Sequence, residues 1–149
     1  MGTRSYDLFW GSILRATTVS HRALHAVSRG RLGRSFPGGA QVVWITTLGR
    51  RSGEWRTTPL LAARDGADWV IAGSNAGQER VPAWVFNIRA HPEGSLQEGD
   101  TCVDVRFTEV HGDEAARLYG LLEQGWSAYR MYRRNIQRDI PVFRVSVRA

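Results

Sequence analysis

Short apolar runs, several of them alternating with polar residues, fill the chain from position 41 onward. They predict six strands, over residues 41–47, 56–64, 68–73, a segment that ends at 97, 101–110 and 140–147. Within 101–110, Val103, Val105 and Phe107 alternate with polar and charged residues, which is typical of a strand with one buried face. Asp65-Gly66 is a turn signal between the second strand and the third.

Apolar residues spaced three and four apart predict helices instead. These cover residues 5–28, 82–90, 112–123 and 126–134. Consecutive strands are joined largely by hairpins, which favours an antiparallel barrel over a doubly wound sheet. We therefore expect an α+β chain, mainly β, whose length suits one domain over residues 1–149. Its parts would be an N-terminal helix with a Gly- and Arg-rich loop over 1–34 and the barrel over 41–148.

The positive charge of the chain indicates an anionic partner. The formal net charge is +6, and every cationic residue is an arginine, whose planar guanidinium binds phosphate and carboxylate groups through paired hydrogen bonds. Lipid headgroups and an acidic cofactor are open as partners, and biased codon usage explains the missing lysines equally well. The arginines are scattered and no recognition motif accompanies them, so we expect no nucleic-acid partner.

The sequence has no run of 18 apolar residues, so no transmembrane helix is predicted and a cytoplasmic location is expected. Phe9 and Trp10 lie near the start of the helix 5–28, which also carries arginines, so peripheral contact of this helix with a membrane surface stays open. Cys102 is the only cysteine, which excludes an intramolecular disulfide, and its valine neighbours predict that it packs as a small apolar residue.

The segment 49–58 carries many hydrogen-bond donors between flanking glycines. Its polar side chains include Arg50, Arg51, Ser52, Arg56, Thr57 and Thr58. Such a loop suits anionic oxygens, although an exposed basic hairpin tip accounts for it equally well. It is not a phosphate-binding Walker loop, because the Gly-Lys-Ser/Thr ending and the following helix are missing.

Two later groups could contact a flat ligand. Small residues at 73–77 directly follow a predicted strand and would let the backbone approach a ring closely. Trp84 and Asn87 lie three residues apart on one helix face, where they could wall a planar ring and hydrogen-bond its edge. Core packing of Trp84 and local capping by Asn87 are the alternative interpretations.

Trp126, Tyr129 and Tyr132 recur at every third residue, so one side of a helical segment is aromatic. This most often means packing, and otherwise a pocket in which a tyrosine donates a proton. Only His21 and His25 have the spacing of metal ligands and no third ligand is evident, so we expect no metal site. The sequence also lacks a Gly-x-Gly-x-x-Gly motif, which argues against a Rossmann nicotinamide site.

Taken in order, these segments resemble the deazaflavin-dependent nitroreductase and quinone-reductase family, which uses coenzyme F420. The matching segments are 46–53, 56–60, 72–77, 82–84 with Asn87 and Arg89, Tyr129 with Tyr132, and 140–142. The resemblance covers most of the chain, from about residue 21 to residue 145. It implies a split β-barrel of about six mostly antiparallel strands, with short peripheral helices, and reduced F420 as the cofactor.

The resemblance also implies roles for matching positions. The phosphate and oligoglutamate tail of the coenzyme would be bound by Arg50, Arg51, Ser52 and Arg56. The wall around the deazaflavin would consist of Thr57, Thr58, Pro59, Leu60, Ala72, Gly73, Ser74, Asn75, Ala83, Trp84, Val85, Phe86 and Asn87. Tyr129 matches a family tyrosine near the ring; it would contact the coenzyme and would orient the substrate or supply a proton. Leu61, Trp126 and Tyr132 would lie on the substrate side.

A reductase of this kind would pass a hydride from reduced F420 to a small organic acceptor, namely a quinone, an enone or a nitro compound. The alternatives are a carrier that binds F420 without turnover and an FMN-dependent oxidoreductase on the same fold. Leu61, Val85 and Trp126 differ from residues common in nitroimidazole-reducing members, so the acceptor is less defined than the coenzyme. Ala76 stands where a second glycine is common, and Gly94 where a β-branched residue is usual. A monomer and a homodimer both stay open.

Overall fold

The computed structural model describes residues 41–148. The N-terminal helix predicted at 5–28, the loop after it and the membrane contact proposed for that helix lie outside the described residues. In the part described, the elements follow the order β1, β2, β3, η1, α2, β4, β5, α3, α4 and β6.

Six strands close into a barrel in the order β1-β2-β3-β6-β5-β4, and every neighbouring pair is antiparallel. Their bounds are Gln41–Leu48, Trp55–Asp65, Asp68–Ala72, Glu93–Glu98, Thr101–Val110 and Val142–Val147 for β1 to β6. The predicted mainly β barrel is confirmed. Closure depends on the pairing of β1 with β4, where Ile45 lies opposite Leu96.

Side-chain alternation along the strands builds the barrel interior. Val105 and Phe107 of β5 are buried, whereas Cys102, Asp104 and Arg106 between and before them are exposed. The prediction that Cys102 packs in the core is therefore wrong. The physical reason is the two-residue period of a strand, which places Cys102 on the outward face whatever its immediate neighbours are.

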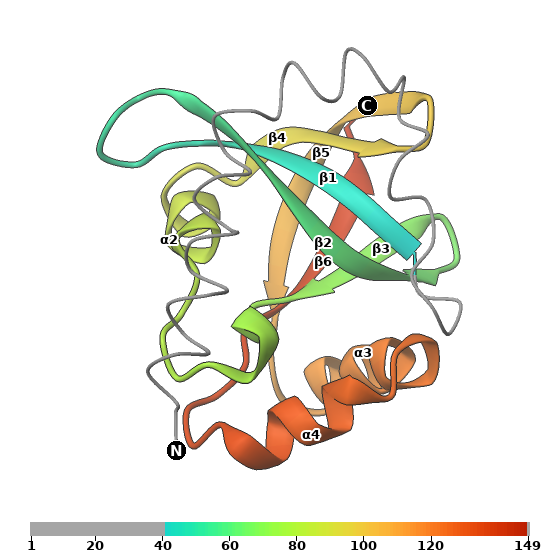
Figure 1. Cartoon of the computed structure of the whole chain (residues 1–149). Coiled ribbons are helices and arrows are strands. Elements are labelled where there is room, and N and C mark those ends of the chain that lie inside the picture. Colours follow the sequence, from blue (N-terminus) through green and yellow to red (C-terminus); the bar gives the residue numbers. More distant parts are fainter. Residues whose placement is uncertain (1–40, 149) are drawn as a thin grey trace.

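Within residues 41–148, three α-helices and one short 3-10 helix pack around the barrel (Figure 1). They are η1 (Asn75–Gly77), α2 (Ala83–Ala90), α3 (Gly112–Gly125) and α4 (Ala128–Asn135). α3 packs on the outer face of β2, β3 and β6 with α4 beside it. α2 lies at another side of the barrel, and the loop between β1 and β2 projects away from α3 and α4 (Figure 1). α2 starts one residue later than predicted, because Pro82 has an extended ψ of 146° and only precedes the helix.

Two apolar clusters result. One fills the barrel and includes Val43, Ile71 and Phe143, with Trp84 of α2 against it. The second lies between the outer face of the strands and the two C-terminal helices, where Leu118 and Leu122 of α3 are almost completely buried. The helices therefore cover an outer face of the barrel, and residues at this second cluster are candidates for a ligand site.

Candidate functional site

The Arg-rich loop is a closed turn between β1 and β2. Gly49 N donates to Glu54 O at 2.8 Å, and Gly53 N donates to Gly49 O at 2.9 Å. Ser52 Oγ accepts a hydrogen bond from Glu54 N at 3.2 Å, so the hydroxyl already supports the turn. Gly49 has no room for a side chain, because an ideal Cβ there would lie 2.4 Å from Ser52 Oγ. The arginines therefore extend from a defined backbone.

Arg50 is held in place by α2. Its backbone N and its Nη1 both donate to Asn87 Oδ1, each at 3.1 Å, and its guanidinium lies 5.0 Å from the ring centroid of Phe86. Asn87 is 5% exposed, so the shared acceptor is shielded from water. The Asn87 side chain therefore fixes the loop rather than capping its own helix, and its contact with a ring edge stays a prediction.

The other two arginines of the loop point outward. Arg51 is exposed and makes no ion pair within residues 41–148. Arg56 is half exposed and has only a long ion pair, 3.6 Å, with Glu54. One anchored guanidinium beside two exposed ones is a suitable donor set for an anionic group, because charged donors hydrogen-bond strongly to phosphate and carboxylate oxygens.

Most of the predicted wall residues of α2 contribute packing. Trp84 is 6% exposed and its ring centroid lies 5.6 Å from that of Phe143 in the barrel. Val85 is completely buried. Only Ala83 and Phe86 among the predicted α2 residues present their side chains to the surface. The core interpretation of Trp84 is therefore the observed one, and a ligand at α2 would meet the exposed pair.

The predicted residues of β2 are divided between two faces of the strand. Leu60 packs against the barrel cluster, whereas Leu61 packs against the cluster under α3 and α4. The hydroxyls of Thr57 and Thr46 form a hydrogen bond, with their oxygens 2.8 Å apart. Thr58 pairs with Ile45, and Pro59 pairs with Trp44. Because neighbouring side chains of a strand point to opposite faces, the β2 residues cannot all line one wall with their side chains.

The loop after β3 approaches α2 closely. Ala72, Gly73 and Ser74 are buried, and an ideal Cβ on Gly73 would lie 2.8 Å from Val85 Cγ2. The Gln78 amide, further along this loop, has a buried Nε2 with no hydrogen-bond partner in the described part of the chain. A buried donor without an acceptor is costly, and a ligand carbonyl would satisfy it.

The aromatic residues Trp126, Tyr129 and Tyr132 lie together in one cluster, although not on one helix. Trp126 ends α3 with an extended backbone, and α4 starts at Ala128, so the three aromatic residues do not share one helix. Tyr129 is nevertheless in the second cluster, against which Leu61, Trp126 and Tyr132 pack. The predicted proton donor and substrate-side residues are thus neighbours in space.

Tyr129 is buried in an aromatic environment. Its ring centroid lies 5.4 Å from that of Tyr132 and 5.6 Å from that of Tyr119, while Tyr119 Oη donates to Tyr129 O at 2.6 Å. Burial, followed by repulsion from the two neighbouring phenols, raises the pKa of Tyr129. The phenol therefore stays protonated at neutral pH and can donate its O–H, while its full ionisation is disfavoured.

These groups form a continuous path along the molecule. The Arg-rich loop contacts α2 through Asn87, α2 contacts the loop after β3 through Val85, and Gly77 of that loop lies against Tyr132 of α4. Figure 1 shows η1 between α2 and α4 in agreement with these contacts. A ligand with an anionic tail and a flat ring fits this donor set, because cations lie at one end of the path and small and aromatic residues at the other.

Sequence reasoning missed Arg138, which lies between α4 and β6. Its guanidinium donates to backbone carbonyls of Gly73 at 3.0 Å, Gln78 at 3.0 Å and Glu79 at 2.6 Å. No local sequence pattern indicates this role of Arg138, because its partners lie about 60 positions earlier in the chain. Within residues 41–148 no group of His, Cys, Asp and Glu could hold a metal, and no helix there is long and apolar enough to cross a membrane.

The fold and this path define a class: a closed antiparallel barrel with a cationic loop at one end of a series of small and aromatic residues. The model of the F420H(2)-dependent quinone reductase family matches residues 17–146, and the chain belongs to this family.

A relative and one solved structure agree with this assignment, and a second solved structure shares the fold. The chain is 32% identical over 125 residues to an F420H(2)-dependent quinone reductase of Mycobacterium tuberculosis strain H37Rv, which covers 82% of this chain and 84% of the relative. A structure titled F420-H2 dependent reductase (FDR-A) is 32% identical, with a TM-score of 0.66 over 70% of this chain and 93% of that one. A structure titled domain-swapped dimer is 27% identical, with a TM-score of 0.69 over 86% and 96%.

Family membership confirms the predicted coenzyme and the predicted class of enzyme. The chain is an oxidoreductase of an F420-dependent family, with reduced F420 as its cofactor. Neither the carrier without turnover nor the FMN-dependent enzyme is favoured by the family or by these relatives. The split-barrel fold expected from the resemblance is confirmed as well.

Proposed function

We propose that this protein reduces a quinone with reduced F420, which it holds along the path from the Arg-rich loop to α4. The observation that carries the proposal is Arg50, fixed through two hydrogen bonds to Asn87 at the base of a loop with two further exposed arginines. A preformed cationic loop binds an anionic tail with little loss of conformational freedom. Residues Arg50, Arg51, Ser52 and Arg56 would bind the tail of the coenzyme.

The ring would lie toward the loop after β3. Ser74 and Asn75 with the exposed part of α2 would contact it there, and Gln78 Nε2, which is buried and has no partner within residues 41–148, would donate to a ring acceptor if binding exposes it. When bound, reduced F420 supplies a hydride, and a quinone that receives it needs one proton to become the hydroquinone. The acceptor would meet Leu61, Trp126 and Tyr132, which surround Tyr129 in one cluster.

The direct test of coenzyme binding is a fluorescence titration of the full chain with F420, followed by steady-state oxidation of F420H2 with menadione. Arg51→Met removes one exposed guanidinium and should weaken coenzyme binding about tenfold, because a charged hydrogen bond at an exposed position contributes near the lower end of about 1.5–3 kcal/mol. Arg106→Met is the control, since Arg106 is exposed on β5 and, in the described part of the chain, pairs only with Glu93. No response of the wild-type protein to F420 would refute the proposal, and an enone and a nitroaromatic in the same assay would rank the acceptors.

Tyr129 has a proposed role in the reaction that the same assay can test. Its buried phenol would donate its proton, or a hydrogen bond, to the oxygen of the acceptor. Tyr129→Phe should leave the affinity for F420 unchanged and lower kcat for menadione about 100-fold if the proton comes from this residue. Full activity of this variant would exclude Tyr129 as the proton donor and leave it only a packing role.

A further inference from the structure

The Arg138 guanidinium donates hydrogen bonds almost entirely to backbone carbonyls of one loop, the one that follows β3. Besides the carbonyls of Gly73, Gln78 and Glu79, its Nη2 also reaches Ser74 O at 3.4 Å and Arg80 O at 3.5 Å. It forms no ion pair with a carboxylate among residues 41–148, and the Glu79 side chain instead accepts from Gln137 N at 2.8 Å. Partial burial lowers the pKa of Arg138, so the fold places this cation here at some cost.

The loop that Arg138 binds has an unfavourable backbone. Asn75 has a φ of 48° and Ala76 a φ of 53°, in the left-handed region that residues with a Cβ rarely adopt. Ala76 has no side chain that could hydrogen-bond locally to offset this. Such a conformation persists only where the surroundings determine it strongly.

The bonds of Arg138 bracket this strained turn. They reach Gly73 and Ser74 before it and Gln78 and Glu79 after it. Both ends of the turn are therefore held by one guanidinium that comes from a distant part of the chain. A guanidinium suits this task because it presents five N–H donors in a rigid plane.

The held turn sets the distance between two walls of the candidate site. Gly73 lies against Val85 of α2, and Gly77 lies so close to Tyr132 of α4 that a Cβ there would be 3.0 Å from its ring. Any change in the turn would move Ser74 and Asn75, the residues proposed to contact the ring, relative to both helices.

We propose that Arg138 is a positioning residue of the coenzyme site, which keeps the segment 73–80 in the conformation that receives the ring. The proposal rests on the proposed function for the identity of the ligand, but not for the state of the loop. If the loop conformation that binds the coenzyme is only partly populated, the apparent dissociation constant for F420 equals the intrinsic one divided by that populated fraction. Once the coenzyme is bound the loop is already in place, so kcat should change little.

The test compares Arg138→Gln with the wild-type protein. Hydrogen exchange of the coenzyme-free protein is measured at the amides of Gly77 and Gln78, whose N–H groups bond to Ser74 O and Asn75 O inside the turn. We expect faster exchange at these two amides, a rise of about tenfold in the Kd and KM for F420, and a kcat within about threefold of wild type. Arg138→Lys, which keeps a cation but not the planar donor set, should recover only part of the affinity.

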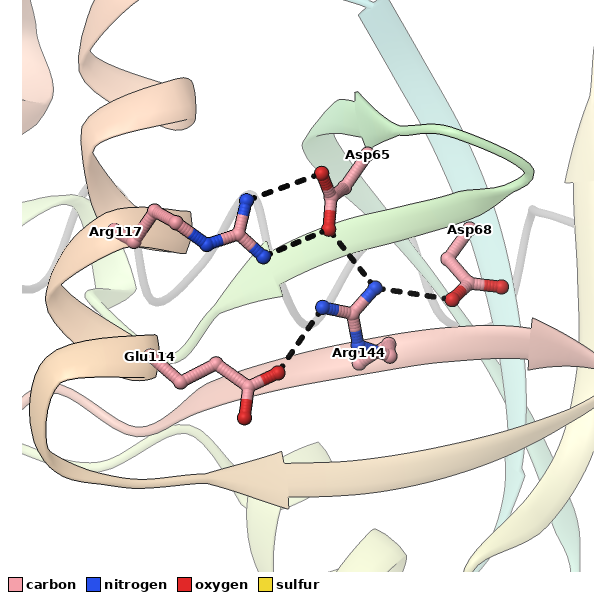
Figure 2. A network of polar contacts seen from close by, with 5 residues as sticks. All are labelled: Asp65, Asp68, Glu114, Arg117 and Arg144. Carbon is pink, nitrogen blue, oxygen red and sulfur yellow. Dashed lines mark hydrogen bonds and ion pairs between the residues drawn. The ribbon is translucent and has the colours of Figure 1, made fainter.

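Arg144→Met is the matched control, because Arg144 also makes several side-chain bonds but lies in a network away from this loop (Figure 2). It should lower the thermal midpoint without changing exchange at Gly77 and Gln78 or the Kd for F420. Unchanged exchange in a folded Arg138→Gln protein would overturn the proposal, as would faster exchange with unchanged affinity. If Arg138→Gln does not fold, Arg138→Lys decides by the same two readouts.

The two proposals fail in different ways. If wild-type protein does not bind F420, the proposed function is refuted, whereas the exchange at Gly77 and Gln78 still reports whether Arg138 holds the turn. If wild-type protein binds F420 and the Arg138 variants bind it equally well, only the positioning role is refuted.

Discussion

Gly94 of β4 shows how a single atom can determine which residue a position accepts. An ideal Cβ there would lie 2.1 Å from the backbone oxygen of Thr46 on β1 and 3.2 Å from Phe107 Cε2. The strand pair β1–β4 closes the barrel, so neither backbone can move away without opening it. This explains why a β-branched residue, which strands otherwise favour, is absent at Gly94.

Gly94→Ala should therefore destabilise the protein strongly, by about 3 kcal/mol or more, since overpacking against backbone costs at least as much as overpacking of a core. Chemical denaturation monitored by tryptophan fluorescence measures the change. Gly120→Ala in α3 is the control, because nothing lies within 4 Å of its Cβ position, and it should stabilise the fold by about 0.5–1 kcal/mol. Equal stability of the two variants would contradict the role of this close approach.

Among the elements, α2 is the one that joins the Arg-rich loop to the barrel. Trp84 and Val85 bury one side of it, and Arg89 on another side forms two hydrogen bonds to Glu109 of β5, at 3.0 and 2.8 Å. The hydrogen bonds from Arg89 lower the pKa of Glu109. A helix held on two sides presents Asn87 to Arg50 in one orientation, which is what a preformed anion site requires.

An ionic network beside α3 connects three elements. Arg144 of β6 lies 2.9 Å from Asp65, 3.0 Å from Asp68 and 3.0 Å from Glu114, and Arg117 of α3 also pairs with Asp65 (Figure 2). The hairpin between β2 and β3, the strand β6 and the helix α3 thus meet at one guanidinium. The hydrogen bonds from Arg117 and then Arg144 lower the pKa of Asp65.

Arg144→Met should lower the thermal midpoint by a few degrees at neutral pH and low salt, because three carboxylates lose their shared partner. A carboxyl with a lowered pKa stabilises the fold above its unfolded value of about 3.9, and this contribution is lost as the pH falls through the lower folded value. The gap between wild type and variant should therefore narrow below about pH 4. Calorimetry as a function of pH measures it, and a gap that widens in acid would contradict this explanation.

At the scale of the complete barrel, the elements were predictable because each depends on neighbours in the sequence. The residue pattern of 101–110 and the turn at Asp65-Gly66 both indicate their structures directly, and β5 and the β2–β3 hairpin lie where they were predicted. The predictions were wrong where a local sequence pattern is compatible with two structures. The valines around Cys102 suggested burial, and the spacing of Trp126 suggested one helix, but strand alternation and the end of α3 decided otherwise.

The sequence by itself determined the hairpin order of the strands, the cationic loop at 49–56 and the family resemblance. These features depend on the hydrophobic period, the turn residues and the order of motifs, all of which are set by residues close together in the chain. Only the tertiary structure decided which side chains meet: Arg50 with Asn87, Leu61 with Tyr129 in one cluster, and Arg138 with the loop after β3. Arg50 and Asn87 are 37 residues apart, and Arg138 and Gly73 are 65 apart. Such contacts form because closing the barrel brings distant segments together, and no spacing along the chain encodes them.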